Sequence, residues 1–146
     1  MLVNSILQRK ALHGVVTISP DAEITKAAAL LAENRIGALV AVDESGALRG
    51  IISERDIVRG LGQHEGGALT LKVSDLMTAN VYTCRGDEPA LSILQTMTEK
   101  RIRHVPVLDE NNRLKGIITI GDAVKSRLDE MDMEVDNLRH YVATSR

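Results

Sequence analysis

Two short stretches of this chain combine a hydroxyl and a carboxylate at a spacing that suits the binding of a sugar phosphate. Residues 50–56 read GIISERD and residues 116–122 read GIITIGD, so an acid follows a hydroxyl by three positions in both. The exposed N–H groups at a helix start carry partial positive charge and favour a phosphate. A carboxylate one turn further along can accept hydrogen bonds from ribose hydroxyls. Ser53 with Asp56, and Thr119 with Asp122, are therefore candidate nucleoside-phosphate sites.

The same spacing has a purely structural interpretation. A hydroxyl followed three residues later by an acid is a capping box, which stabilises a helix start by roughly 1 kcal/mol without any ligand. The two stretches therefore predict strand-to-helix junctions in either case. A binding site additionally needs neighbouring strands to complete it.

The repetition extends well beyond these stretches. A shift of sixty-six residues without gaps aligns the chain from Val15 onward with the chain from Val81 onward, which indicates an internal duplication. The identical pairs are Val15/Val81, Thr17/Thr83, Asp21/Asp87, Glu33/Glu99, Arg35/Arg101, Ile36/Ile102, Asp43/Asp109, Glu44/Glu110, Leu48/Leu114, Gly50/Gly116, Ile51/Ile117, Ile52/Ile118, Asp56/Asp122 and Val58/Val124. The period is too long for a solenoid unit, so each copy is expected to be a small α/β domain.

Apolar periodicity and turn residues predict the order β-α-β-β-α in each copy. The expected elements of copy one are a strand over 15–18, a helix over 23–34, strands over 39–42 and 48–52, and a helix from residue 53. In copy two they are a strand over 81–84, a helix over 90–100, strands over 105–108 and 114–118, and a helix from residue 119. A short helical lead-in precedes each copy. The predicted boundaries are a first domain over 1–62, a linker over 63–70, a second domain over 71–128 and a helical extension over 129–146.

The extension carries an apolar pattern typical of a self-association helix. Spacings of four and three residues alternate along Val124, Leu128, Met131, Val135, Leu138 and Val142. The other positions between residues 129 and 136 are mostly acidic, which leaves a narrow apolar stripe. We expect a homodimer in which this stripe takes part; packing of the helix on its own domain is the alternative.

Composition argues against several functional classes. With 18 basic and 20 acidic side chains there is no basic footprint for nucleic acid or an anionic membrane, and no apolar run is long enough to span a bilayer. The single cysteine, Cys84, gives no reason to expect an oxidising compartment, so a cytoplasmic location is expected. The four histidines show no metal-binding spacing, and Cys84 replaces Ile18 in the repeat, as a buried hydrophobe would. We therefore expect neither an enzyme, nor a metal site, nor a catalytic cofactor.

The duplicated pattern resembles a tandem pair of cystathionine β-synthase (CBS) domains, also called a Bateman module, over nearly the whole chain. The resemblance rests on the two repeated stretches, on residues 35–43 and 101–109, and on residues 73–78 leading into 81–83. It implies two copies packed through their sheets about a pseudo-twofold axis, with two clefts that commonly bind adenosine nucleotides. It also implies that Asp56 and Asp122 hold ribose hydroxyls, that Ser53 and Thr119 contact phosphate, and that the clefts are lined by Thr17, Ile18, Thr83, Val105 and Pro106.

The two clefts are expected to differ. Copy two has Arg103 and His104 where copy one has Gly37 and Ala38, so we expect the basic pair to favour AMP in the Asp122 cleft. Solvated surface charges are the alternative interpretation of that pair. In copy one, the small pair and Arg55 suggest room beside Asp56 for ADP, ATP or NAD(H).

The resulting hypothesis is a regulatory module that senses an adenosine nucleotide and signals to a separate, unidentified protein effector by changing conformation. The alternative is a constitutive dimerisation or protein-interaction module with vestigial clefts.

Overall fold

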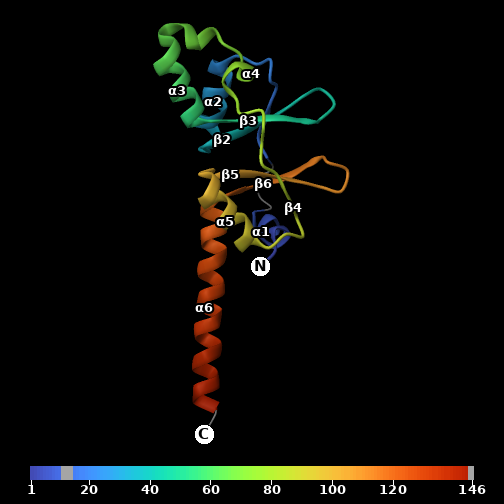
Figure 1. Ribbon diagram of the computed structural model, residues 1–146, viewed down its shortest axis with the longest axis vertical. Helices are drawn as coiled ribbons and strands as arrows, with labels where there is room; N and C mark the ends of the chain where they lie inside the picture. Colours follow the sequence, from blue (N-terminus) through green and yellow to red (C-terminus); the bar gives the residue numbers. More distant parts are fainter. Residues whose placement is uncertain (11–14, 145–146) are drawn as a thin grey trace.

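The chain folds into two three-stranded sheets with flanking helices and one long C-terminal helix (Figure 1). The computed structural model describes residues 1–10 and 15–144. The first copy contains β1 (Thr17–Ile18), α2 (Ile24–Asn34), β2 (Ala38–Val42), β3 (Leu48–Ser53) and α3 (Glu54–His64). The second contains β4 (Cys84–Arg85), α5 (Ala90–Lys100), β5 (His104–Leu108), β6 (Leu114–Thr119) and α6 (Ile120–Thr144). The predicted β-α-β-β-α order of each copy is confirmed.

The first strand of each copy is shorter than expected. β1 pairs in parallel with β2 only through Thr17 and Ile18, and β4 pairs with β5 only through Cys84 and Arg85. The predicted strands over 15–18 and 81–84 therefore begin too early. The preceding residues, Val15 and Val81, instead line the clefts described below.

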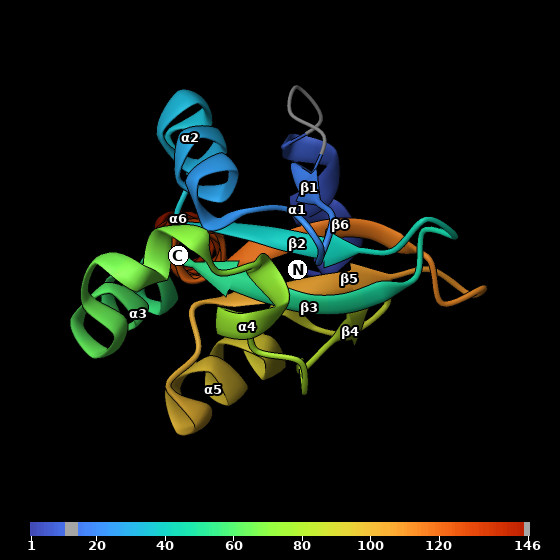
Figure 2. The same ribbon diagram turned by 90° about the horizontal axis from the view of Figure 1, so that it is seen from above.

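The two sheets lie face to face, with β2 and β3 over β5 and β6 (Figures 1 and 2). Alternate residues of a strand point to opposite faces of its sheet. Leu39 and Ala41 of β2 belong to the core of the first copy, whereas Val105 and Val107 of β5 belong to the core of the second. The intervening residues, Val40 and Pro106, are also fully buried but belong to neither core. They fill the interface between the sheets.

The two short lead-in helices cross over, so that each completes the core of the other copy. α1 (Val3–Arg9) contributes Val3 and Ile6 to the second core, and α4 (Val73–Leu76) contributes Val73 to the first. Their backbone hydrogen bonds are equivalent: Val3 N–H donates to the Glu88 carbonyl at 3.0 Å, and Val73 N–H donates to the Ala22 carbonyl at 2.8 Å. The predicted boundaries over 1–62 and 71–128 grouped each lead-in with its own copy, whereas the packing exchanges them.

The glycine that opens each repeated stretch allows this crossing. A Cβ on Gly50 would lie 2.6 Å from Met77 Sδ and 2.8 Å from the Thr78 carbonyl oxygen. A Cβ on Gly116 would lie 2.6 Å from Leu7 Cδ2. All three distances are below van der Waals contact, so only glycine lets the lead-in segment pass this close to the strand.

The residues predicted as a linker are structured. α3 continues through His64, and a 3₁₀ helix, η1 (Glu65–Thr70), follows it and buries Ala68 completely. At the other end of the chain, α6 includes the predicted extension as far as Thr144; residues 145–146 lie outside the described part. Within the described residues, no helix is both long and apolar enough to cross a bilayer.

Candidate functional site

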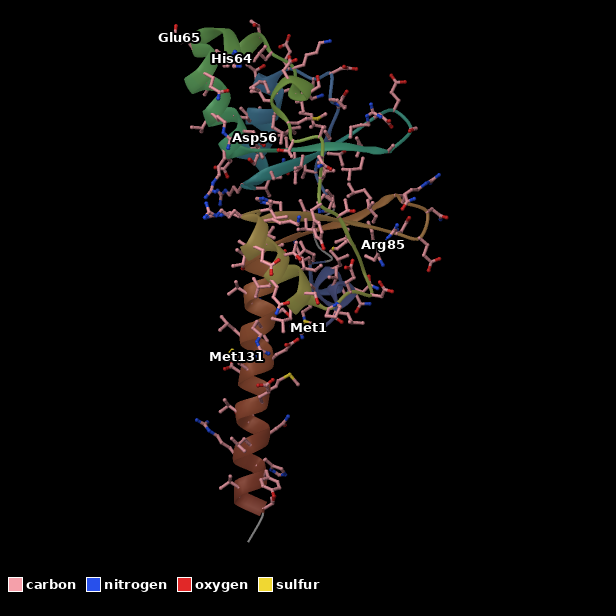
Figure 3. The ribbon with its side chains drawn as sticks, in the orientation of Figure 1. Met1, Asp56, His64, Glu65, Arg85 and Met131 are labelled. Atoms are coloured by element: carbon pink, nitrogen blue, oxygen red, sulfur yellow. The ribbon has the colours of Figure 1, made fainter. Side chains whose placement is uncertain are left out.

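The first candidate site lies where β3 ends and α3 begins. Ser53 is the N-cap residue: its hydroxyl accepts a hydrogen bond from the Asp56 N–H at 3.3 Å, and its own N–H donates to Asp56 Oδ2 at 2.9 Å. The predicted capping box is thus present. Asp56 also lies 3.6 Å from the Arg59 guanidinium through its other oxygen. Figure 3 shows Asp56 at the end of α3 nearest the second copy.

The second candidate site repeats this geometry where β6 ends and α6 begins. Asp122 Oδ2 accepts from the Thr119 N–H at 2.9 Å, and the Asp122 N–H donates to the Thr119 hydroxyl at 3.1 Å. One feature differs. Lys10 Nζ donates to Asp122 Oδ2 at 2.7 Å and to the Ile117 carbonyl at 3.0 Å, so an ammonium occupies the position where a ligand hydroxyl could reach Asp122.

A cavity of about 400 Å³ opens at the first box, and we call it the Ser53 cleft. Both copies line it. Copy one contributes Ser53 and Asp56, and copy two contributes Tyr82, Arg103 and His104. Its charged lining consists of the guanidinium groups of Arg55, Arg59, Arg101 and Arg103 and the carboxylates of Glu54 and Asp56. Cations outnumber carboxylates, so this cleft can hold an anion beside a hydroxyl-binding carboxylate.

A larger cavity of about 880 Å³ opens at the second box, and we call it the Thr119 cleft. It is also lined by both copies, with Thr119 and Ile117 from the second and Ile36, Gly37 and Ala38 from the first. Among the described residues that line it, the cations are Lys10, Arg35 and Lys115, and none is a carboxylate. Both cavities fall within the roughly 300–1,000 Å³ typical of small-molecule sites.

The structure corrects the expected difference between the clefts. Arg103 lines the Ser53 cleft and not the cleft beside Asp122. Conversely, Ala38 lines the Thr119 cleft, and Gly37 lines both. The reason is that β2 and β5 meet across the sheet interface, so each middle strand presents its first residues to the cap of the other copy. The basic, smaller cleft is therefore at Asp56, and the roomier cleft is near Asp122.

His104 separates the two clefts and lines both. Its imidazole lies close to Gly37, where an added Cβ would be 3.5 Å from the ring. Burial lowers the pKa of His104, and the nearby charge of Lys10 lowers it further, although Glu54 acts in the opposite direction. The ring is thus held neutral between the clefts, where it can both donate and accept a hydrogen bond.

Six of the predicted site residues line neither cleft: Thr17, Ile18, Thr83, Val105, Pro106 and Asp122. Ile18 and Val105 point into the hydrophobic cores, and Pro106 is buried between the sheets. Asp122 remains next to its cleft through Thr119 and Lys10. The others line a cleft: Gly37, Ser53, Arg55, Asp56, Arg103 and His104 line the Ser53 cleft, and Gly37, Ala38, His104 and Thr119 line the Thr119 cleft.

An arginine was missed in each cleft. Arg35 lines the Thr119 cleft and Arg101 lines the Ser53 cleft. Both end a helix in the left-handed conformation, with φ of 52° and 56°, which costs a non-glycine residue about 1 kcal/mol or more. The sequence signal that could have identified them is that both copies have an arginine at this position. An arginine present twice in a strained backbone conformation suggests a role for its side chain.

The lead-in segments also reach the clefts. Lys10 lines the Thr119 cleft. A shift of seventy residues, which relates Val3 to Val73, also relates Lys10 to Asn80. Asn80 lines the Ser53 cleft. Sequence spacing could not predict this, because the contact depends on the crossing of α1 and α4.

Cys84 has the buried, unreactive environment of a core residue. It is 3% exposed, within the second core, and burial raises the pKa of its thiol to about 12. A thiol in this environment has almost no thiolate at neutral pH and is a poor nucleophile.

The sequence and fold match known proteins throughout. The family model described as the CBS domain matches residues 7–63 and again residues 73–129. Among curated relatives, the mitochondrial CBS domain-containing protein CBSX3 of Arabidopsis thaliana is 33% identical over 84% of this chain. The aligned region is 61% of that relative's length.

Solved structures agree in fold. The CBS-domain containing protein ATU1752 from Agrobacterium tumefaciens superposes with a TM-score of 0.82 at 42% identity, covering 87% of this chain and 99% of that one. The domain pair of the protein MJ0100, solved in complex with 5′-methylthioadenosine and S-adenosyl-L-methionine, gives 0.76 at 34% identity and covers 90% and 98%. The protein PAE2072 from Pyrobaculum aerophilum, solved with AMP, gives 0.74 at 26% identity and covers 84% and 89%.

Proposed function

Because this chain belongs to the CBS domain family, as a tandem pair of CBS domains, we propose that it is a regulatory module that binds an adenosine derivative between its two copies. The observation that carries the proposal is that each capping box opens onto a cleft lined by both copies. Family members of this fold have been solved with AMP and with S-adenosyl-L-methionine, which supports an adenosine ligand.

In the Ser53 cleft, Asp56 would accept the ribose hydroxyls. Ser53 and the guanidinium groups of Arg101 and Arg103 would contact the phosphate, because planar guanidinium groups bind phosphate with two parallel hydrogen bonds. The small volume and positive lining favour a mononucleotide such as AMP. The Thr119 cleft has twice the volume and would accept a larger ligand, such as ATP or a dinucleotide, once Lys10 leaves Asp122.

Binding would change the relation of the copies, because the ligand contacts both. A ligand that prefers one arrangement of the two sheets shifts the population toward it, and a separate protein could recognise that arrangement. The alternative, a constitutive interaction module, predicts no ligand in either cleft.

Titration calorimetry with AMP, ATP and NADH tests the proposal on the variants Asp56→Ala and Asp122→Ala. We expect Asp56→Ala to weaken AMP binding at least tenfold and Asp122→Ala to weaken binding of the larger ligand. Asp75→Ala is the matched control, because Asp75 makes the same type of N-terminal cap, to the Lys72 N–H at 2.9 Å, but neither Asp75 nor Lys72 lines a cleft. Unchanged ligand affinity in both Asp56→Ala and Asp122→Ala would contradict the proposal.

A further inference from the structure

The end of α6 forms a surface that the clefts do not explain. Every residue from Met131 to Thr144 is exposed, and this stretch, which we call the α6 tail, runs clear of the rest of the molecule (Figures 1 and 3). The first part of α6 is anchored by the buried residues Ala123 and Ser126 and by the ion pairs of Asp129 with Arg9 and of Glu130 with the N-terminal amine. A helix of this length is marginally stable in water by itself, so packing against another surface would be needed to keep it fully helical.

Most of the exposed large apolar residues of α6 lie on one side of the helix; Met133 and Tyr141 are exposed elsewhere on it. We call Val124, Leu128, Met131, Val135, Leu138 and Val142 the apolar stripe; the exposed fractions of these side chains range from 42% to 63%. In heptad terms, Leu128, Val135 and Val142 are at a positions, and Val124, Met131 and Leu138 are at d positions. In parallel coiled coils, β-branched residues at a combined with leucine at d favour two strands over three or four. Val135, Leu138 and Val142 show this combination.

We propose that the apolar stripe packs against the same stripe of a second copy of this chain, as a parallel, in-register two-stranded coiled coil that begins near Val124. This assembly goes beyond the proposed ligand binding and does not depend on it. It places both domain pairs at the same end of the coiled coil.

The charges beside the stripe select this orientation. Arg127 and Glu134 occupy g positions on one flank, where they lie 3.8 Å apart, and Asp132 and Arg139 occupy e positions on the other. In a parallel pair, each g residue meets the following e residue of the second copy. Arg127 then faces Asp132, and Glu134 faces Arg139. Both contacts are between opposite charges, and symmetry repeats them.

The antiparallel alternative places like charges together. With the stripes fully overlapped and the helices reversed, g residues meet g residues and e residues meet e residues. Glu134 would then face Glu134 of the second copy, and Asp132 would face Asp132 of the second copy. Lys125 would face Arg139 of the second copy. Charge complementarity therefore favours the parallel pair over its reverse.

Charge reversal in the full chain, followed by sedimentation equilibrium at micromolar concentration, tests the orientation. Arg139→Glu should raise the dimer dissociation constant about tenfold, because it converts two attractive contacts to repulsive ones. The double variant Glu134→Arg with Arg139→Glu should recover most of the affinity. Asn137→Glu is the control, because it adds a negative charge away from the stripe and should leave the dimer unchanged.

A cysteine cross-link gives an independent test of register. In the parallel pair, position 138 of one copy lies beside position 138 of the other, so Leu138→Cys should form a disulfide-linked dimer under mild oxidation. Asn137→Cys, one residue away and off the stripe, should not. The native Cys84 does not compete, because it is buried in the second core.

These experiments can overturn the proposal in several ways. A wild-type chain that remains monomeric at micromolar concentration overturns it. A dimer that is insensitive to Arg139→Glu shows that another surface pairs. A dimer that is strengthened by Arg139→Glu, without cross-linking of Leu138→Cys, shows an antiparallel pair.

Discussion

At the scale of single residues, the repeated stretches combine three separate roles. The glycine admits a lead-in segment from the neighbouring copy, the apolar residues build the strand, and the hydroxyl and acid cap the next helix. The cap hydrogen bonds use Oδ2 of each aspartate and leave Oδ1 outside the cap, so capping and ligand binding are compatible. Asp56 and Asp122 differ mainly in their cation, which is Arg59 for one and Lys10 for the other.

The two repeated glycines should tolerate alanine unequally. Gly50→Ala is expected to destabilise the fold by about 1–3 kcal/mol, because the new methyl group meets the Thr78 backbone oxygen, which cannot rotate away. Gly116→Ala should cost less, because it meets only the end of the Leu7 side chain. Urea unfolding measures the difference. Gly62→Ala, in open space on α3, is the control and should be neutral or slightly stabilising; an equal cost at positions 50 and 116 would contradict this account.

His104 should make stability depend on pH. Its folded pKa is lowered, chiefly by burial, so the unfolded chain takes up the extra proton first as the pH falls through about 6.5. The contribution is present above that pH and is lost as the pH falls toward the folded pKa. Urea unfolding between about pH 7 and 5 should therefore show a shallower loss of stability in His104→Gln than in the wild type. His64→Gln, on an exposed residue of α3, should follow the wild type.

At the scale of elements, the crossing of α1 and α4 joins the two copies. Each lead-in helix is held by backbone hydrogen bonds and by one fully buried valine, Val3 or Val73. The two copies therefore depend on each other for their cores. This reciprocity follows from the pseudo-twofold relation, since any exchange made by one copy is repeated by the other.

The crossing predicts where a core substitution acts. Val3→Ala and Val73→Ala should each cost about 2 kcal/mol, because each removes buried methyl groups from a packed core. Hydrogen exchange locates the effect: Val3→Ala should raise exchange mainly in β4, β5 and β6, and Val73→Ala mainly in β1, β2 and β3. If each variant instead loosened the copy that follows it in the chain, the exchanged packing would be refuted.

At the scale of the whole molecule, the clefts exist only because the two sheets meet. Gly37 and His104 come from different copies and lie side by side at the boundary of both clefts. A ligand in either cleft would contact both copies and stabilise their association. In the proposed function, this arrangement would convert a binding event into a change that spans both copies.

Ligand binding should accordingly stabilise the whole molecule. AMP at about 100 times its dissociation constant should add about 2.7 kcal/mol to the free energy of unfolding, which raises the midpoint of thermal unfolding by several degrees. Hydrogen exchange should slow in β2 and β3 and also in β5 and β6. Absence of any thermal shift with AMP, ATP or NADH would favour the constitutive interaction module, whereas protection confined to one copy would refute coupling through the clefts.

Local patterns determined much of this protein. The duplication, the order of strands and helices, both capping boxes and the apolar stripe of α6 follow from spacings of a few residues, because short-range periodicity and cap chemistry act within one element. Only the tertiary structure decided which cleft each residue lines and which core each lead-in helix completes. A repeat shows that Arg103 and Gly37 are equivalent positions, but it does not show whether a strand lines its own cleft or the opposite one. The facing sheets and the crossed lead-in helices decide that, which is why the basic cleft lies at Asp56 and the roomier cleft near Asp122.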